Sequence, residues 1–220
     1  MSIIVKNLKK LYDGNVILDG VSNNIEKNTI TVILGENGSG KTTYLKCLSK
    51  LLIPDFGSVQ YQDKKAKNQE KMISLLLESN KYLLQNLTVI ENIKYILAIH
   101  GIKYRERKDI VQKYLEIFSI KEHEFFLVSK LSQGVRQKVA LVCTLAHDVE
   151  YVFLDEPTAA LDTGAIDDLA KVINSLCDRT FVIATHDENF EKLLNCNTLT
   201  FSNGKLLSKE CEEVNRLEVS

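Results

Sequence analysis

The sequence is short of several features that would assign it to a class at once. It has no tryptophan and only two prolines in 220 residues. No apolar run reaches the 18 or so residues that a membrane-spanning helix needs, so at a membrane another chain would have to do the spanning. Lysine and arginine total 28 against 29 aspartates and glutamates. That balance excludes a global positive field, and we expect no nucleic-acid partner.

Cysteine is too sparse for a disulfide framework or a zinc site. The five cysteines are widely spaced, odd in number, and form no C-x-x-C pair. This pattern favours buried or idle thiols in a reducing cytosol. The first residues do not resemble a signal peptide, because polar residues interrupt the apolar run after Val5.

Short apolar runs alternate with helical patterns along the whole chain. Strands are expected at 29–34, 72–77, 151–154 and 180–184, and helices at 42–52, 89–99, 104–118, 133–146 and 164–176. This alternation predicts an α/β core with a mostly parallel sheet. No linker, repeat or low-complexity segment divides the chain, so residues 1–220 are expected to form a single domain.

Three segments depart from this rhythm. Residues 89–131 are helical in pattern without a convincing strand, which predicts a helical subdomain of about 88–148 inserted in the core. The first 26 residues read as a small antiparallel hairpin. The tail repeats that style, with Asn203 and Gly204 in the turn between two apolar runs.

A glycine-rich loop between a strand and a helix provides the first chemistry. Gly35-x-x-x-x-Gly40-Lys41-Thr42 follows an apolar run and precedes a helical pattern, the context that a phosphate-binding loop needs. Lys41 would reach the β- and γ-phosphates of a nucleotide, and the Thr42 hydroxyl would be a Mg²⁺ ligand. The candidate phosphate-binding residues are Gly35, Glu36, Asn37, Gly38, Ser39, Gly40, Lys41, Thr42 and Thr43.

Two further strand ends carry candidate catalytic residues. The strand that begins at Tyr151 ends in Asp155 and Glu156, and buried carboxylates are costly without partners. We expect Asp155 to hold Mg²⁺ and Glu156 to act as general base toward the attacking water. His186 ends another strand, where a neutral imidazole could sense the γ-phosphate by hydrogen bonding.

With these residues in place, the chain resembles the ATP-binding subunit of ABC transporters from about residue 3 to residue 207. The family's motifs occur in the family's order: Walker A at 35–42, the signature segment at 131–138, Walker B at 151–156, the D-loop at 160–162 and the switch histidine at 185–187. Tyr12 lies where the family places an aromatic residue that stacks on adenine. The resemblance implies a P-loop NTPase core with an N-terminal antiparallel β-subdomain and an inserted helical subdomain.

The resemblance also implies how the protein works. Two such ATPase subunits, copies or paralogues, pack head to tail around ATP and Mg²⁺. The signature residues of one then face the γ-phosphate held by Lys41 of the other, and Asp162 belongs to the D-loop. The signature residues that act in this way are Leu131, Ser132, Gln133 and Gly134. A separate transmembrane permease is the other implied partner, which places the subunit in the cytoplasm, peripheral on the cytoplasmic face of the cell membrane.

Two departures from the family pattern are visible. In the signature LSGGQ, Gln133 replaces the first of its two glycines and Val135 replaces the glutamine. Similar variants occur in exporter-type subunits, so the interpretation leans to export. The family's Mg²⁺-contacting glutamine before 87–89 is missing. Ser79 occupies that position by count, and Glu78 or Ser79 is left as a substitute, directly or through water.

Other classes compete with the transporter hypothesis. One is a soluble ABC-type ATPase without a membrane partner. DNA-repair members carry a long coiled coil between Walker A and the signature, and translation members carry two ATPase domains, but neither occurs in this chain. Iron–sulfur assembly members are harder to exclude. A nucleotide-gated binding module that barely hydrolyses ATP is a further class, and Glu156 argues against it.

Overall fold

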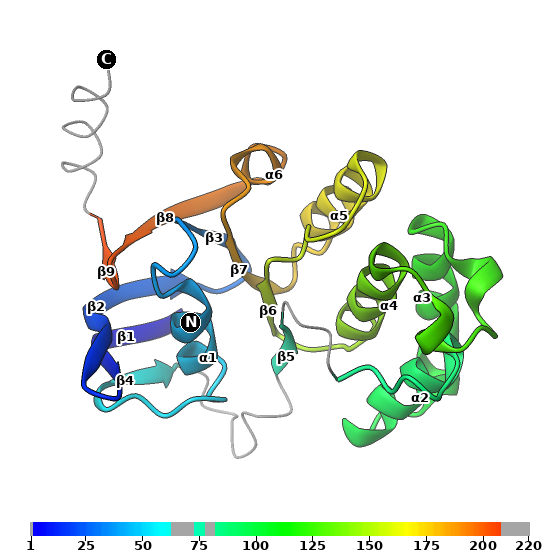
Figure 1. Cartoon of the computed structure of the whole chain (residues 1–220), viewed down its shortest axis with the longest axis horizontal. Coiled ribbons are helices and arrows are strands. Elements are labelled where there is room, and N and C mark those ends of the chain that lie inside the picture. Colours follow the sequence, from blue (N-terminus) through cyan, green and yellow to red (C-terminus); the bar gives the residue numbers. More distant parts are fainter. Residues whose placement is uncertain (1, 63–72, 78–81, 208–220) are drawn as a thin grey trace.

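The computed structural model describes residues 2–62, 73–77 and 82–207. A central six-stranded sheet has the order β5-β6-β7-β3-β8-β9 (Figure 1). Its strands are β3 Ile30–Leu34, β5 Ile73–Leu76, β6 Tyr151–Asp155, β7 Thr180–Thr185, β8 Cys196–Ser202 and β9 Lys205–Leu206. All neighbours pair in parallel except β8 and β9. The predicted α/β class with a mostly parallel sheet is confirmed.

A second, antiparallel sheet is formed mainly by the N-terminal residues. Its strands β1 Ser2–Tyr12, β2 Asn15–Glu26 and β4 Phe56–Tyr61 have the order β2-β1-β4. The sequence predicted the hairpin of β1 and β2 but not β4. Phe56 pairs with Lys9, and Tyr61 pairs with Ile3, so this strand depends on partners about fifty residues away. No local pattern reveals such pairing.

Six α-helices are described: α1 Lys41–Leu48, α2 Val89–Ile99, α3 Tyr104–Ile117, α4 Gln133–Leu145, α5 Thr163–Ser175 and α6 Glu188–Lys192. The first is four residues shorter at its end than the predicted 42–52. Lys50 follows it with φ of 61°, a left-handed conformation of the kind that ends helices. The sequence missed α6, whose five residues begin after Asp187; that side chain accepts from the N–H groups of Asn189 and Phe190.

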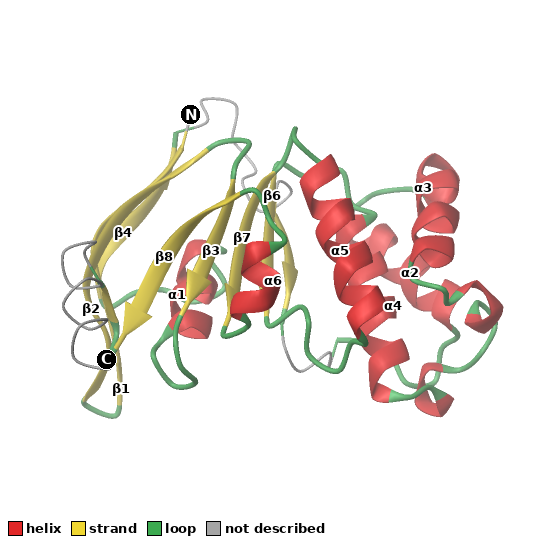
Figure 2. Ribbon diagram, turned by 90° about the horizontal axis from the view of Figure 1, so that it is seen from above, coloured by secondary structure: helices red, strands yellow, loops and turns green. Residues whose placement is uncertain are grey.

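The two faces of the central sheet bury separate apolar clusters. Strand β6 alternates between them: Tyr151 and Phe153 join one cluster, while Val152 and Leu154 join the other. The first cluster also holds α1 and the antiparallel sheet, so α1 lies between the two sheets (Figure 2). The second holds the inward faces of α2, α3, α4 and α5. Successive side chains of a strand point to opposite faces of the sheet. This alternation fixes which face of the sheet packs against α1 and the phosphate loop.

Helices α2, α3 and α4 lie together at one end of the molecule, away from the antiparallel sheet (Figure 1). The chain enters α2 through a capping box, in which Thr88 accepts from the Glu91 N–H and Glu91 accepts from the Thr88 N–H. From 89 to 131 the structure has helices, two short 3-10 helices (Lys121–His123 and Val128–Lys130) and one isolated bridge between Thr88 and Leu127. The boundaries predicted for a helical subdomain, 88–148, stay a prediction.

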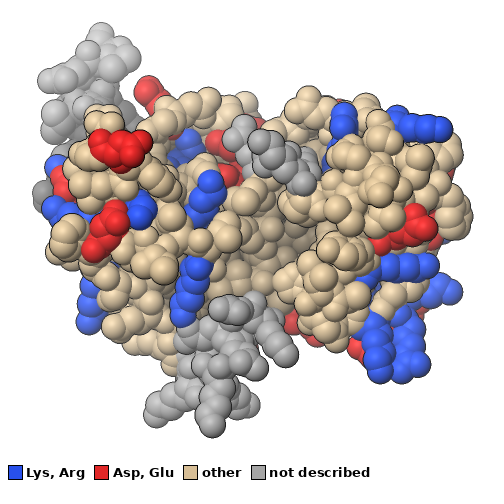
Figure 3. All heavy atoms as spheres, turned by 60° about the horizontal axis from the view of Figure 1, so that its bottom comes forward, with Lys and Arg blue, Asp and Glu red and all other residues tan. Residues whose placement is uncertain are grey.

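Two surface properties follow from the fold. None of the helices in residues 2–62, 73–77 and 82–207 is long and apolar enough to cross a membrane. Lysines and arginines are mixed with aspartates and glutamates on the face shown in Figure 3.

Inside the molecule, burial raises the pKa of the Cys47 thiol to about 11. Cys47 is therefore an unreactive protonated thiol near neutral pH.

Candidate active site

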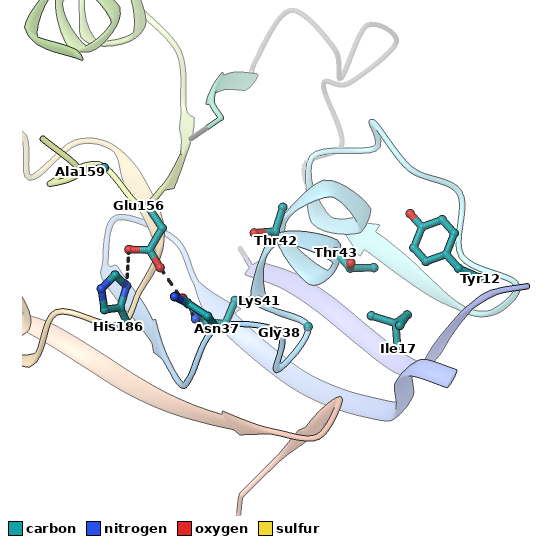
Figure 4. A pocket seen from close by; sticks show the side chains of 11 residues that line it. Tyr12, Ile17, Asn37, Gly38, Lys41, Thr42, Thr43, Glu156, Ala159 and His186 are labelled. Atoms are coloured by element: carbon teal, nitrogen blue, oxygen red, sulfur yellow. Dashed lines mark ion pairs between the residues drawn. The ribbon is translucent and has the colours of Figure 1, made fainter. Parts of the chain in front are cut away.

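A cavity of about 400 Å³ lies where the phosphate loop meets the ends of β6 and β7 (Figure 4). It is lined by Tyr12, Ile17, Asn37, Gly38, Gly40, Lys41, Thr42, Thr43, Glu156, Ala159 and His186. Most of these were singled out from the sequence. Ile17 and Ala159 were not, because neither residue type carries a chemical signal.

The phosphate loop joins β3 to α1 in a shape that requires a small residue. Gly40 has φ of 106°, and a Cβ atom there would lie 2.9 Å from the carbonyl oxygen of Ile17, which favours glycine. Gly40 also stands at the N-cap of α1, where it has no side chain to cap the helix. The first N–H groups of α1 are therefore open to an anion, with the positive end of the helix dipole behind them.

Lys41 is buried and bound to its own loop. Its ammonium donates to the carbonyl oxygens of Gly35 at 2.7 Å and Glu36 at 3.0 Å. It also lies 3.8 Å from Oε1 of Glu156. A phosphate group in the cavity would offer the same cation stronger, charged acceptors. The loop thus holds the Lys41 ammonium beside the cavity that it lines.

Two oxygen ligands of the kind that Mg²⁺ prefers converge beside Lys41. The Thr42 hydroxyl donates to Oδ1 of Asp155 at 3.0 Å, and Asp155 is almost completely buried. Magnesium in nucleotide sites is held by one or two protein oxygens together with waters and phosphate oxygens. The donor set and its place next to the phosphate loop fit that ion.

Glu156 is held in an unusual backbone conformation. Its φ is 46°, a left-handed value that is rare for a residue with a side chain and is concentrated at functional sites. Its N–H donates to the carbonyl oxygen of Ala184 at 2.8 Å, which ties the end of β6 to β7. The Thr185 hydroxyl donates to Oε2 of Glu156 at 3.1 Å. The carboxylate is thereby aimed at the cavity.

His186 contacts this carboxylate directly. Its Nδ1 lies 3.0 Å from Oε2 of Glu156, and the ring is largely exposed on the other side. The sequence predicted a histidine close to the γ-phosphate; the structure adds Glu156 as a partner of its ring (Figure 4). Thr185 was missed as a site residue, although its position directly before His186 was a usable signal.

The cavity has an apolar end opposite the carboxylate. Figure 4 shows Tyr12 and Ile17 at one end and Glu156 and His186 at the other, with Lys41 between them. Tyr12 is 46% exposed, and the Lys10 ammonium lies 5.6 Å from the centre of its ring. An exposed ring at this end can stack on a flat base, since it is not enclosed by its own fold.

The signature residues lie outside this cavity. Ser132 caps α4 by accepting from the Val135 N–H at 3.3 Å, and Ser132 and Gln133 are exposed. Leu131 is only 6% exposed and packs in the core. Gly134 lies against the backbone of Ala160, where a Cβ atom would come within 2.7 Å of a carbonyl oxygen.

Asp162 begins α5 and does not line the cavity. Its carboxylate accepts from the Ala165 N–H at 2.9 Å and from the Lys138 ammonium at 3.1 Å. The N–H bond, followed by the lysine, holds the pKa of this carboxyl below its usual range. The prediction for Ser79, like the suggested substitute Glu78, lies outside the described residues.

Comparison with known proteins agrees with this geometry. Residues 18–159, more than half of the chain, match the family described as ABC transporter. The chain belongs to the ABC transporter family. In that family it is an ATPase, which confirms the predicted enzyme class.

Two curated ABC relatives cover almost the whole chain. The phosphonates import ATP-binding protein PhnC of Fusobacterium nucleatum is 31% identical over 99% of this chain and 96% of its own length. The tungstate uptake system ATP-binding protein TupC of Peptoclostridium acidaminophilum is 32% identical over 94% of this chain and 97% of its own. An ABC ATP-binding subunit is therefore confirmed, whereas the predicted export direction stays a prediction.

Solved ABC structures share the fold. One described as the ATP-binding subunit of an ABC transporter covers 100% of this chain and 94% of its own, with a TM-score of 0.84 and 21% identity. A dimeric bacterial ABC transporter cassette covers 94% of this chain and 97% of its own, with a TM-score of 0.80 and 23% identity. The likeness in fold therefore extends over nearly the whole chain.

Proposed function

We propose that this chain binds ATP with Mg²⁺ in the cavity between Tyr12 and Glu156 and hydrolyses it to drive transport through a separate permease. The observation that carries the proposal is the single line of groups along this cavity. An aromatic ring stands at one end, the Lys41 ammonium in the middle, and a positioned carboxylate at the other. That order matches the base, the phosphates and the attacking water of a bound nucleotide.

Each polar group has a distinct part in the proposed reaction. Lys41 and the N–H groups of α1 bind the phosphates. The Glu156 carboxylate accepts a proton from water as the water oxygen attacks the γ-phosphorus. The bond from that phosphorus to the bridging oxygen breaks, which leaves ADP and inorganic phosphate. His186 and Thr185 hold the carboxylate in line, because both contact its Oε2 atom.

Thr42 and Asp155 are the residues that would hold Mg²⁺, which neutralises phosphate charge when bound. Their contact at 3.0 Å aligns both oxygens on one side of the loop. In our proposal, none of the residues that the structure describes replaces the Mg²⁺-contacting glutamine that the family has before 87–89. The substitutes expected from the sequence, Glu78 or Ser79, stay predictions.

The active unit is proposed to be a head-to-tail pair of ATPase subunits, copies of this chain or paralogues. Ser132 and Gly134 lie away from the chain's own cavity, and Ser132 and Gln133 are exposed. The helix that Ser132 caps would direct a second dipole at the phosphate held by the partner's loop. Such a pair buries two nucleotides, and hydrolysis releases it.

Coupling to a permease places the subunit on the cytoplasmic face of a membrane. The helical part of the chain offers an apolar surface for this purpose, since Phe125 is 75% exposed and Phe126 is 53% exposed. Exposed adjacent aromatics of this kind are typical of docking sites. The altered signature residues Gln133 and Val135 favour export, whereas the relatives above carry import names.

Affinity capture from native membranes tests the transporter part of the proposal. The chain, tagged and carrying Glu156→Gln, should recover a multi-span protein that raises the ATPase rate of the wild-type chain when the two are reconstituted. A Phe126→Asp variant should lose this partner and keep its own ATPase rate. Recovery of soluble partners alone would favour the alternative, a soluble ABC-type ATPase such as one for iron–sulfur assembly. Cargo movement in sealed vesicles of known orientation decides between export and import.

A further inference from the structure

The loop after Glu156 is held by the signature helix of the same chain. Gln137 lies one turn into α4, and its side-chain amide donates to the carbonyl oxygen of Pro157 at 2.9 Å. Both residues are buried, and Gln137 is only 1% exposed. Pro157 directly follows Glu156, so this bond acts one residue away from the carboxylate.

Two neighbouring contacts fix the same loop to the same helix. The Lys138 ammonium meets the Asp162 carboxylate at the loop's end. Gly134 meets the backbone of Ala160 in the loop's middle, so closely that no Cβ fits. Ala160, like Glu156, has a positive φ, 60° against 46°. A loop with two such conformations is stable only when its surroundings hold it. Helix α4 contacts this loop at its start, in its middle and at its end.

We propose that Gln137 is a positioning residue for Glu156 of its own chain. This inference rests on the proposed function, in which the N-terminus of α4 faces the ATP held by the partner. A single rigid helix then contacts the partner's nucleotide through Ser132. Through Gln137 it positions the carboxylate that accepts the proton of the attacking water at its own chain's nucleotide. A buried amide suits this task, since it fixes a backbone carbonyl by direction as well as distance.

The variant Gln137→Met removes the donor and keeps the length and apolar stem of the side chain. We expect kcat for ATP hydrolysis to fall roughly tenfold, about 1.4 kcal/mol of transition-state stabilisation. The KM for ATP should change less than about threefold, because neither Gln137 nor Pro157 lines the cavity. The matched control is Gln112→Met, whose amide contacts Glu124 on the helical part. It should leave both constants unchanged.

Mixed dimers of two differently tagged copies separate positioning from a general defect. One copy carries Glu156→Gln, so that only the Glu156 of the other copy works. Gln137→Met is then placed either on the copy with the live Glu156 or on the copy that lends Ser132 to it. Relative to the mixed dimer that carries Glu156→Gln alone, positioning in the same chain predicts the tenfold loss in the first arrangement and unchanged turnover in the second. Equal loss in both, or loss in the second alone, would overturn the inference.

Hydrogen exchange on the single chain gives a readout that does not need the dimer. In the wild type, the Ala159 N–H donates to the carbonyl oxygen of Glu156 and the Leu161 N–H to the carbonyl oxygen of Thr158. Gln137→Met should speed exchange at both amides and leave the amides of α4 protected. Unchanged exchange there would contradict the positioning role. If the wild-type chain neither dimerises nor hydrolyses ATP, the proposed function fails, and this experiment still decides the role of Gln137.

Discussion

The Nδ1 atom of His186 lies 3.0 Å from the carboxylate oxygen Oε2 of Glu156. This contact joins the residues that follow two adjacent parallel strands, β6 and β7. It gives the exposed imidazole a role of its own, which is to hold the general base in place. A histidine that acts through Glu156 affects the chemical step more than the binding of ATP.

The first prediction follows from that contact. His186→Ala should lower kcat roughly 10- to 100-fold, at or below the lower limit of what positioned acid–base groups contribute, because the ring acts through Glu156. ATP affinity should stay within about threefold. His186→Gln, which keeps a hydrogen-bond donor near Glu156, should recover part of the loss. Steady-state phosphate release measures both, and His123→Ala is the control. A variant that weakens ATP binding as much as turnover would place the ring at the nucleotide instead.

The second prediction concerns Lys41. In the proposed complex its ammonium donates charged hydrogen bonds to the phosphates, and such bonds contribute about 1.5–3 kcal/mol each. Lys41→Ala should therefore weaken binding of a fluorescent ATP analogue at least roughly tenfold. Lys46→Ala, on the same helix but away from the cavity lining, is the control. Undiminished affinity in the Lys41 variant would reject the assignment of the phosphate loop.

The third prediction concerns the metal. Thr42→Val removes the hydroxyl that donates to Asp155 and keeps the shape of the side chain. The Mg²⁺ concentration for half-maximal ATPase activity should rise roughly tenfold, and chelation should abolish activity until Mg²⁺ is restored. Thr29→Val, whose hydroxyl donates to the Glu26 carbonyl, serves as the isosteric control. The same Mg²⁺ dependence in wild type and Thr42→Val would remove Thr42 from the metal site.

The fourth prediction concerns stability against pH. Burial, and then the charge of His100, lowers the pKa of His147 from 6.5 to about 3. Below about pH 6.5 the unfolded chain therefore binds a proton that the folded chain refuses. The free energy of unfolding should fall as the pH drops toward 3, by at most about 1.4 kcal/mol per pH unit.

Urea unfolding at about pH 7.5 and pH 5 measures this effect. His147→Gln should reduce the loss of stability between the two values, while His123→Gln should not. A wild-type stability that stays constant or rises on acidification would contradict the burial of a neutral His147.

Local chemistry explains how much of the site was predictable. The phosphate loop could be recognised because Gly40, Lys41 and Thr42 are adjacent in sequence and follow an apolar strand. Glu156 could be recognised for the same reason, as the residue after a buried strand. In both cases, the residues that identify the function are neighbours along the chain.

Partners supplied by sheet order could not be predicted. The Thr185 hydroxyl reaches Glu156 only because β7 lies beside β6, and strand order is a property of the whole fold. At the apolar end of the cavity, Tyr12 and Ile17 of the antiparallel sheet lie beside the loop that starts at Gly35. The hydrogen bond from Gln137 to Pro157 joins residues that are twenty apart in the sequence. A glutamine in a helix and a proline after a strand are both ordinary, so neither residue indicated this contact.

The fold shows the same division. The strands expected at 151–154 and 180–184 are present because buried parallel strands are continuously apolar. The tail was expected only as a hairpin about Asn203 and Gly204, but its first strand, β8, also pairs in parallel with β3. Its burial is only partial, so its sequence carries a weaker apolar signal. Strand β4 needed β1 for its definition.

Phosphate release by Glu156→Gln tests the central claim, that Glu156 hydrolyses ATP held by the phosphate loop. The account predicts that this variant binds Mg²⁺-ATP, forms an ATP-stabilised dimer in size-exclusion chromatography, and releases phosphate at least roughly 100-fold more slowly than the wild type. Glu150→Gln, which removes only a partly exposed ion pair with Lys27, should release phosphate at the wild-type rate. Unchanged phosphate release by Glu156→Gln would contradict the mechanism.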